Sequence, residues 1–260
     1  MGLMGETIER ENMEEIRLNK YLSEAGVCSR READRLIELG RVFVDGERAQ
    51  TGMKVRPDQD IVCNGKPVRH EERPVLLAVN KPKGIVCTAA NARVEKDNIV
   101  DFLHYPQRIY PVGRLDKDSE GLILMTNQGD IVNKILRGSN DHEKEYIVKV
   151  NRPVTEAFLN AMASGVPILD TVTKPCQVEA LGKREFRIVL TQGLNRQIRR
   201  MCEALGYRVM DLKRVRIMNI KLGSLKTGEY RELTREEQEE LRRLLAGSSN
   251  LSYKDRHCEQ

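Results

Sequence analysis

Chemically versatile side chains are concentrated in one short segment, GRLDKDSEGLILMTN at residues 113–127. Five charged residues lie within eight positions and an apolar run follows directly, which predicts a charged turn leading into a buried strand. Asp116 could then lie inward at the edge of the core, while Lys117 and Asp118 face water. Two alternatives stay open here: a simple solvated turn, and a glycosidase-like carboxylate pair, although two aspartates only two positions apart set no defined separation.

A second segment, LTQGLNRQIRRMCEALGYRV at residues 190–209, predicts a basic helix. Asn195 can cap this helix at its start, and Gly206 can end it. The apolar side chains recur with helical spacing and form one stripe, made of Ile198, Met201, Cys202 and Leu205. We expect this stripe to face the core.

Three arginines of this helix differ in their expected positions. Arg196 and Arg200 project away from the apolar stripe, where they could bind phosphate groups. Arg199 lies at the edge of the stripe, about 100° from Ile198 around the helix, and its long side chain could reach into a cleft. An arginine there would keep a buried aspartate ionised, because a nearby opposite charge lowers the pKa of a carboxylic acid.

The elements that precede both segments form a small module at residues 17–68. Helical spacing predicts a first helix that stops at Gly26, and Ser29 followed by Glu32 predicts a capped second helix. An Asp-Gly pair at 45–46 then predicts a β-hairpin. The second helix carries basic residues that form either an ordinary solvated face or an RNA-binding face, namely Arg30, Arg31 and Arg35.

The rest of the chain divides around this module. We expect an acidic extension at residues 1–16, a polar linker at 69–74 and a disordered tail at 247–260. Residues 75–246 mix strands and helices without regular alternation, which predicts an α+β domain with a mixed or antiparallel sheet. That sheet must position the charged turn and the basic helix.

Composition narrows the possible functions. No apolar run approaches the roughly 20 residues of a membrane-spanning helix, and the acidic N-terminus is unlike a targeting peptide, so we expect a cytoplasmic protein. Six cysteines without a CxxC pair predict neither a zinc site nor a disulfide framework, and no motif for a redox cofactor is present. The net charge is +5 overall but +11 over residues 17–235, which favours a polyanionic partner.

Four segments resemble, in their order along the chain, the motifs of the RNA pseudouridine synthases: KPKG, YPVGRLDKDSEGLILMTN, EKEYIVKV and QGLNRQIRRM. The resemblance is to the branch that modifies ribosomal RNA one uridine at a time. The module at 17–68 resembles the αL-type RNA-binding module of a ribosomal protein and some tRNA synthetases. Together they imply an αL-type module followed by a synthase domain that flips a uridine out of its stack and isomerises it without a metal or cofactor.

The resemblance also assigns roles to individual residues. It implies that Asp116 is the catalytic carboxylate, that Arg114 replaces the flipped uridine in the RNA helix, and that Arg199 pairs with Asp116. Tyr146 would stack on the uracil and could take the proton from its carbon five. Further contacts to the RNA are expected from six basic residues: Lys81, Arg196, Arg200, Arg30, Arg31 and Arg35.

One variant of these motifs bears on the target. Most relatives in this branch have histidine where Arg196 stands, and LTQGLNRQIRRMCEALGY is similar to the bacterial large-subunit enzymes that act near the peptidyl-transferase region. This similarity implies U2604 of 23S ribosomal RNA as the target. We also expect the protein to be a monomer. Three alternatives stay open: a synthase for another rRNA or tRNA uridine, a non-catalytic RNA-binding or ribosome-assembly factor, and an RNA N-glycosidase that releases free uracil.

Overall fold

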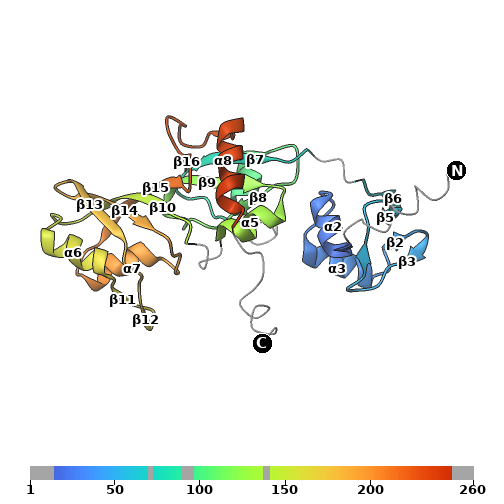
Figure 1. The fold of residues 1–260 in the computed structure, drawn as a ribbon, viewed down its shortest axis with the longest axis horizontal. Coiled ribbons are helices and arrows are strands. Elements are labelled where there is room, and N and C mark those ends of the chain that lie inside the picture. Colours follow the sequence, from blue (N-terminus) through green and yellow to red (C-terminus); the bar gives the residue numbers. More distant parts are fainter. Residues whose placement is uncertain (1–14, 70–72, 89–96, 137–140, 248–260) are drawn as a thin grey trace. The chain divides into compact units, whose positions relative to one another are not determined.

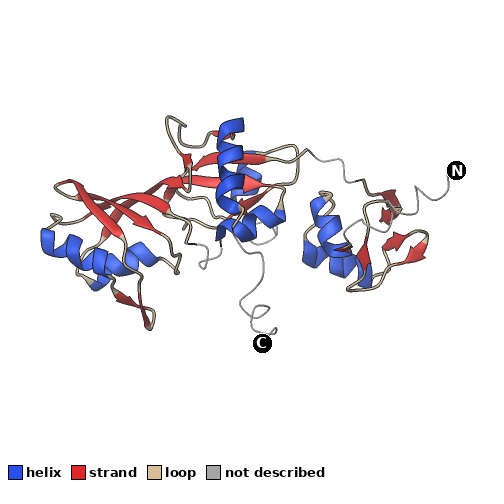
Figure 2. Ribbon diagram, viewed as in Figure 1, coloured by secondary structure: helices blue, strands red, loops and turns tan. Residues whose placement is uncertain are grey.

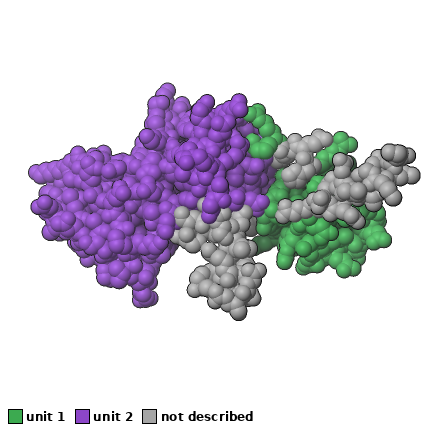
Figure 3. Space-filling model, in the orientation of Figure 1, with its two compact units in different colours: residues 1–74 green, residues 75–260 purple. Residues whose placement is uncertain are grey.

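The computed structural model describes four stretches of the chain, residues 15–69, 73–88, 97–136 and 141–247. The chain forms two compact units, residues 1–74 and 75–260 (Figure 3). Most of the predicted acidic extension, most of the predicted tail and the middle of the predicted linker lie outside the described residues. Within the described stretches, no helix is both long and apolar enough to cross a membrane.

The first unit is built on two helices and short antiparallel strands (Figure 1). Helices α2 (Leu18–Glu24) and α3 (Arg30–Glu38) bury their apolar faces in a common core. Strand β1 pairs with β4, and the other four strands form a sheet in the order β3-β2-β5-β6. The strands are β1 (Ile16–Arg17), β2 (Val42–Val44), β3 (Glu47–Arg48), β4 (Lys54–Val55), β5 (Ile61–Cys63) and β6 (Lys66–Pro67).

Two local predictions for this unit are confirmed. Asp45 and Gly46 both have positive φ, 51° and 84°, as a tight two-residue hairpin turn requires, and they join β2 to β3. The Ser29 hydroxyl accepts a hydrogen bond from the Glu32 backbone N–H at 3.2 Å and so caps α3. The Glu32 carboxylate pairs with Arg35 at 3.2 Å.

The second unit is organised by one mixed sheet (Figure 2). Its main path runs β13-β14-β10-β15-β9-β7-β17, with β16 added to β15 and β8 added to β9. Strands β9 and β15 are parallel and join two antiparallel halves, which confirms the predicted α+β class with a mixed sheet. The strands are β7 (Leu76–Lys81), β8 (Tyr110–Val112), β9 (Glu120–Thr126), β10 (Lys144–Val150), β13 (Gln177–Gly182), β14 (Glu185–Leu190), β15 (Val209–Ile217), β16 (Ile220–Lys221) and β17 (Tyr230–Glu232). A separate hairpin pairs β11 (Pro167–Ile168) with β12 (Thr171–Val172).

Helices cover both faces of this sheet. Successive residues of a strand point to opposite sides, so one strand can contribute apolar side chains to a core on each face. Leu122 and Leu124 of β9 share a core with α5 (Gly129–Leu136) and α8 (Arg235–Leu245). Ile123 and Met125 share the opposite core with α4 (Ile99–Leu103). The half formed by β10 and β14 packs against α6 (Glu156–Ser164) and α7 (Gln197–Ala204). The sheet therefore ties the charged turn before β9 to the basic helix α7.

The pairing register aligns four residues in one row across the sheet. Lys81 on β7 pairs with Gly121 on β9, Gly121 with Arg214 on β15, and Arg214 with Tyr146 on β10. Gly121 has a φ of 108°, and a Cβ atom there would collide with the Arg214 backbone, so only glycine fits where β9 and β15 meet. The charged turn ends where β9 begins and lies beside this row.

Candidate active site

The turn that carries Asp116 is held from within by buried groups. The Lys81 Nζ donates a hydrogen bond to the Ser119 carbonyl at 2.9 Å. The Leu115 N–H donates to the Cys87 Sγ at 3.4 Å. Asp116 lies between the anchored residues Leu115 and Ser119 with its side chain 34% exposed, so its carboxylate lies at the edge of the core, as predicted.

Lys81 is placed differently from its predicted role as an RNA contact. Its side chain is fully buried, and its Nζ donates to the carbonyls of Pro82 and Ser119. Burial lowers the pKa of the ammonium group, against the opposing effects of Cys87 and Asp116. From sequence, a lysine at the start of a Pro-Lys-Gly turn is expected to be exposed, and only the pairing of β7 with β9 brings it under the turn. Lys81 therefore supports the Asp116 turn from inside.

Arg196 also lies elsewhere than predicted. It has a left-handed backbone, with φ of 50°, and occupies the N-cap position of α7, so the helix begins at Gln197 and the predicted Asn195 cap is wrong. Its side chain turns back toward the charged turn, where it donates to both Asp118 carboxylate oxygens at 3.3 and 3.2 Å. It also lies 3.5 Å from the Asp116 carboxylate. The prediction placed Arg196 on the far face because it assumed a helical backbone at this residue.

Arg199 reaches the same turn from the first turn of α7. Its side chain is only 14% exposed, which agrees with the predicted position at the edge of the apolar stripe. Its Nη2 donates to the Asp118 carbonyl at 3.2 Å and to the Ser119 hydroxyl at 3.0 Å. The Asp118 carboxylate lies 3.3 Å away, whereas the Asp116 carboxylate lies 3.9 Å from Nε. The shorter ionic contact is thus to Asp118.

Asp118 was expected to face water, and the structure corrects this in part. Its side chain is half exposed, but it forms ion pairs with Arg196 and Arg199. Burial pushes the pKa of its carboxyl group up, yet the hydrogen bond from Arg196 and the charges of both arginines outweigh this and lower the pKa overall. Asp118 therefore ties α7 to the turn, and Asp116 has longer, looser contacts to the same arginines.

Tyr146 lies on β10, directly across from Arg214 on β15. Its ring packs against both the core under α7 and the core under α4, and the Arg214 guanidinium carbon lies 6.0 Å from the ring centre. Arg214 was not singled out from the sequence. Its strand also carries Asp211, Lys213 and Arg216, so no local pattern distinguishes Arg214.

The remaining predicted residues fall into two groups. Arg114 is exposed at the start of the charged turn, two residues before Asp116. Arg200 donates hydrogen bonds to the backbone carbonyl and the side-chain oxygen of Asn195. The arginines of α3 lie in the first unit and are all exposed: Arg30, Arg31 and Arg35.

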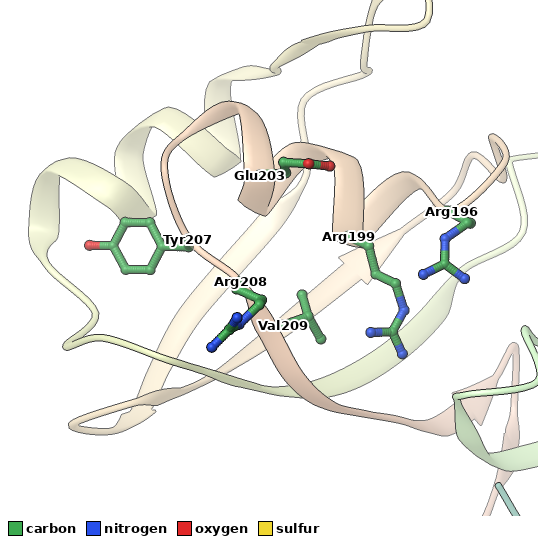
Figure 4. Close-up of a pocket in the computed structure, with 6 residues that line it drawn as sticks. All are labelled: Arg196, Arg199, Glu203, Tyr207, Arg208 and Val209. Atoms are coloured by element: carbon green, nitrogen blue, oxygen red, sulfur yellow. The ribbon is translucent and has the colours of Figure 1, made fainter.

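A pocket of about 320 Å³ opens beside the two aspartate-binding arginines (Figure 4). It was not predicted, and it is lined by Arg196, Arg199, Glu203, Tyr207, Arg208 and Val209. Figure 4 shows the Arg196 and Arg199 side chains descending from the start of α7, while the Tyr207 ring points away from them. A volume of this size can hold a small ligand or part of a nucleotide, and the exposed Arg208 adds a further positive charge.

The arrangement supports chemistry by a carboxylate. Asp116 is partly shielded from water and lies next to two arginines, an environment that suits a nucleophile or a general base. In the described part of the chain, no cluster of histidine, cysteine, aspartate and glutamate could hold a metal ion.

Comparison with known proteins shows the family to which the chain belongs. Residues 16–61 match the S4 domain family, and residues 75–204 match the RNA pseudouridylate synthase family. The dual-specificity RNA pseudouridine synthase RluF of Escherichia coli (strain K12) is 55% identical over 237 residues, which cover 90% of this chain and 81% of that protein. The ribosomal large subunit pseudouridine synthase B of Bacillus subtilis (strain 168) is 37% identical over 241 residues, which cover 90% of this chain and 98% of that protein.

A solved structure gives the same result. The crystal structure of a pseudouridylate synthase is 31% identical, with a TM-score of 0.63, and the match covers 88% of this chain and 99% of that one. The order of the two matched families is the order of the module and the synthase domain expected from the sequence. This chain belongs to the RNA pseudouridylate synthase family and is an RNA pseudouridine synthase with an S4 domain before its synthase domain.

Proposed function

We propose that this enzyme converts one specific uridine of 23S ribosomal RNA to pseudouridine, at U2604 near the peptidyl-transferase region. The observation that carries the proposal is the position of Asp116 at the edge of the sheet, 3.5 Å from Arg196 and 3.9 Å from Arg199. The names of the relatives support the substrate class, since one is a dual-specificity RNA synthase and another a ribosomal large subunit synthase.

The proposed reaction needs a carboxylate and a flipped base. Asp116 acts on the sugar or base of the flipped uridine, as a nucleophile or as the base that removes a sugar proton. The bond between N1 of uracil and C1′ of ribose breaks, the uracil turns, and C5 bonds to C1′. A proton leaves C5 and another is bound at N1, so no electrons are exchanged with an oxidant. Shielding of the site from water keeps the detached base in place and prevents hydrolysis of the sugar intermediate.

Two further side chains complete the proposed site. Tyr146 forms the platform on which the uracil stacks, and its hydroxyl is the proposed acceptor of the C5 proton. Arg114, exposed at the entrance of the turn, fills the space that the uridine leaves in the RNA helix. Flipping costs unstacking energy, which such a replacement offsets.

The rest of the RNA is held by charge and shape. The exposed arginines of α3 (Arg30, Arg31 and Arg35) and the pocket arginines (Arg196 and Arg208) are the proposed phosphate contacts. Arg200 lies on α7 next to Arg199 and can exchange its hydrogen bonds to Asn195 for a phosphate. We also propose that the enzyme acts as a monomer, in the cytoplasm with the ribosomal RNA.

The proposal is tested with RNA that carries tritium at carbon five of its uridines. A 23S rRNA fragment that includes U2604 should release tritium while its sugar–phosphate chain stays intact, and the same fragment with cytidine at that position should release none. Release of free uracil would support an N-glycosidase, and no reaction would support a binding factor. A matched tRNA is included because a relative is named as dual-specific; tritium release from tRNA alone would contradict the ribosomal target.

A further inference from the structure

Arg214 of β15 stands out from the other arginines of the described chain because it is buried, with only 4% of its surface exposed. Its Nε donates to the Leu122 carbonyl at 2.7 Å. Its Nη2 is also buried, and the described residues offer it no acceptor. Buried polar groups are normally satisfied, and an unsatisfied donor on a charged group is destabilising. An arginine retained in this state calls for a role outside the stability of the fold.

The sheet places this guanidinium beside the catalytic residues. Arg214 is the cross-strand partner of Tyr146, with its guanidinium carbon over the Tyr146 ring at 6.0 Å, and the parallel partner of Gly121 at the start of β9. The turn that carries Asp116 leads directly into β9. Arg214 therefore lies between the proposed platform for the uracil and the strand that fixes the catalytic turn.

Basic side chains gather around Arg214 in the described part of the chain. Lys81 is fully buried in the same row of the sheet. Lys144 begins β10, and burial together with the charge of Arg214 lowers its pKa to about 8. The nearby acids, Asp116 and Asp118, are already shared with the two arginines of α7. The interior below the site thus carries excess positive charge in a low-dielectric region, where its effect is strong.

The reaction creates a negative charge that this excess can stabilise. When the bond between N1 and C1′ breaks, its electron pair stays on the uracil and is spread over N1 and the two carbonyl oxygens. Asp116 is an anion and cannot stabilise this charge. A fixed cation near the base can do so without reorganisation during the step, which is the effect of a preorganised electrostatic site.

We propose that Arg214 is a positioning residue of this reaction: it holds the Tyr146 ring from behind and supplies the fixed positive charge that stabilises the detached uracil anion. The inference rests on the proposed roles of Asp116 and Tyr146. It predicts that Arg214 affects the chemical step far more than the binding of RNA.

Three substitutions test this in the full-length enzyme. Arg214→Met removes the charge at similar volume, Arg214→Lys keeps a charge without the planar donors, and Arg214→Ala leaves space for a small guanidinium ion. The single-turnover rate at saturating RNA should fall about 100-fold in Arg214→Met, the magnitude typical of losing one preorganised donor, and less in Arg214→Lys. The Kd for RNA should stay unchanged, and millimolar ethylguanidinium should raise the rate of Arg214→Ala, whereas the same concentration of sodium chloride should not.

Arg216→Met is the matched control. Arg216 lies two positions along the same strand, and it pairs with Glu143 and Glu145 at 2.9 and 2.8 Å. Its removal should lower the Tm while leaving the single-turnover rate near that of the wild type. A decrease in rate in Arg214→Met no larger than in the control, or no rescue of Arg214→Ala by ethylguanidinium, would overturn the inference. Inactive wild-type enzyme would instead contradict the proposed function, so the two failures are distinguishable.

Discussion

Replacing Arg199 with methionine should reduce both stability and catalytic rate. Methionine keeps the unbranched side chain against the core but removes every hydrogen bond of the guanidinium. Arg199 Nη2 donates to the Asp118 carbonyl at 3.2 Å and to the Ser119 hydroxyl at 3.0 Å, and lies 3.3 Å from the Asp118 carboxylate. These interactions tie α7 to the turn, so removing them should affect both elements.

The size of the stability decrease follows from burial. A hydrogen bond to a charged group contributes about 1.5–3 kcal/mol, and buried Ser119 loses a donor that water does not easily replace. The Asp118 carboxylate is half exposed, so its ion pair adds only about 0.2–1 kcal/mol. We expect the free energy of unfolding to fall by about 3 kcal/mol, which lowers the Tm by about 6–12 °C for a domain of this size.

The rate should fall as well, because Asp116 loses one of its two cationic neighbours. We expect a decrease of about 100-fold in the single-turnover rate at saturating RNA, similar to the removal of one fixed electrostatic partner. Tritium release from carbon five measures the rate, and differential scanning calorimetry measures the Tm. Arg187→Met is the control, since Arg187 pairs with Glu179 and Glu145 on the sheet surface and should change neither quantity strongly. An Arg199→Met enzyme with wild-type rate and Tm would refute the assigned role of the ion-pair network.

Three other predictions concern pH and RNA binding. Because the pKa of Asp118 is lowered, its ionised form stabilises the fold above about pH 4, and this stabilisation is lost as the pH falls through the folded-state pKa. The Tm difference between wild type and Asp118→Asn should therefore shrink on acidification. A constant difference would contradict the ion pair. The pKa of Lys144 is lowered to about 8, so its buried ammonium group destabilises the fold below pH 8, and this destabilisation disappears by about pH 10.4. Lys144→Met should therefore have a higher Tm than wild type at pH 7. Calorimetry should show that this difference in Tm decreases toward pH 10. Replacing the α3 arginines together (Arg30, Arg31 and Arg35) by alanine should weaken RNA binding without changing the single-turnover rate. The slope of log affinity against log salt should become shallower by up to about 0.9 for each phosphate that the variant no longer binds. Equal salt slopes for the variant and the wild type would show that α3 does not bind RNA.

Local patterns predicted most of the secondary structure correctly. The Asp-Gly turn of the β2–β3 hairpin, the Ser29 cap of α3 and the apolar stripe of α7 each depend on residues close in sequence. The strand after the charged turn was predicted for the same reason, because its apolar run and flanking glycines are local signals. The edge position of Arg199 also followed from helical geometry alone.

Two failures of the sequence analysis involve contacts between distant parts of the chain, and a third has a local cause in the backbone. Lys81 is buried because β7 pairs with β9, and Arg214 reaches the carbonyl of Leu122 across the parallel junction of β9 and β15. No local pattern reveals either contact. Arg196 was misplaced because its left-handed backbone, uncommon for a residue that is not glycine, starts the helix one residue late and turns the side chain toward Asp118.

The central claim is that Asp116 is the catalytic carboxylate, and Asp116→Asn tests it most directly. Asparagine keeps the shape of the side chain but removes the charge that attacks or accepts a proton. The measurement is tritium release from carbon five of U2604 in a single turnover, with Kd for the same RNA and the Tm as controls for binding and folding. We predict that release falls below detection while both controls stay close to the wild type. Release at the wild-type rate from a folded, RNA-bound Asp116→Asn enzyme would contradict the catalytic role of Asp116.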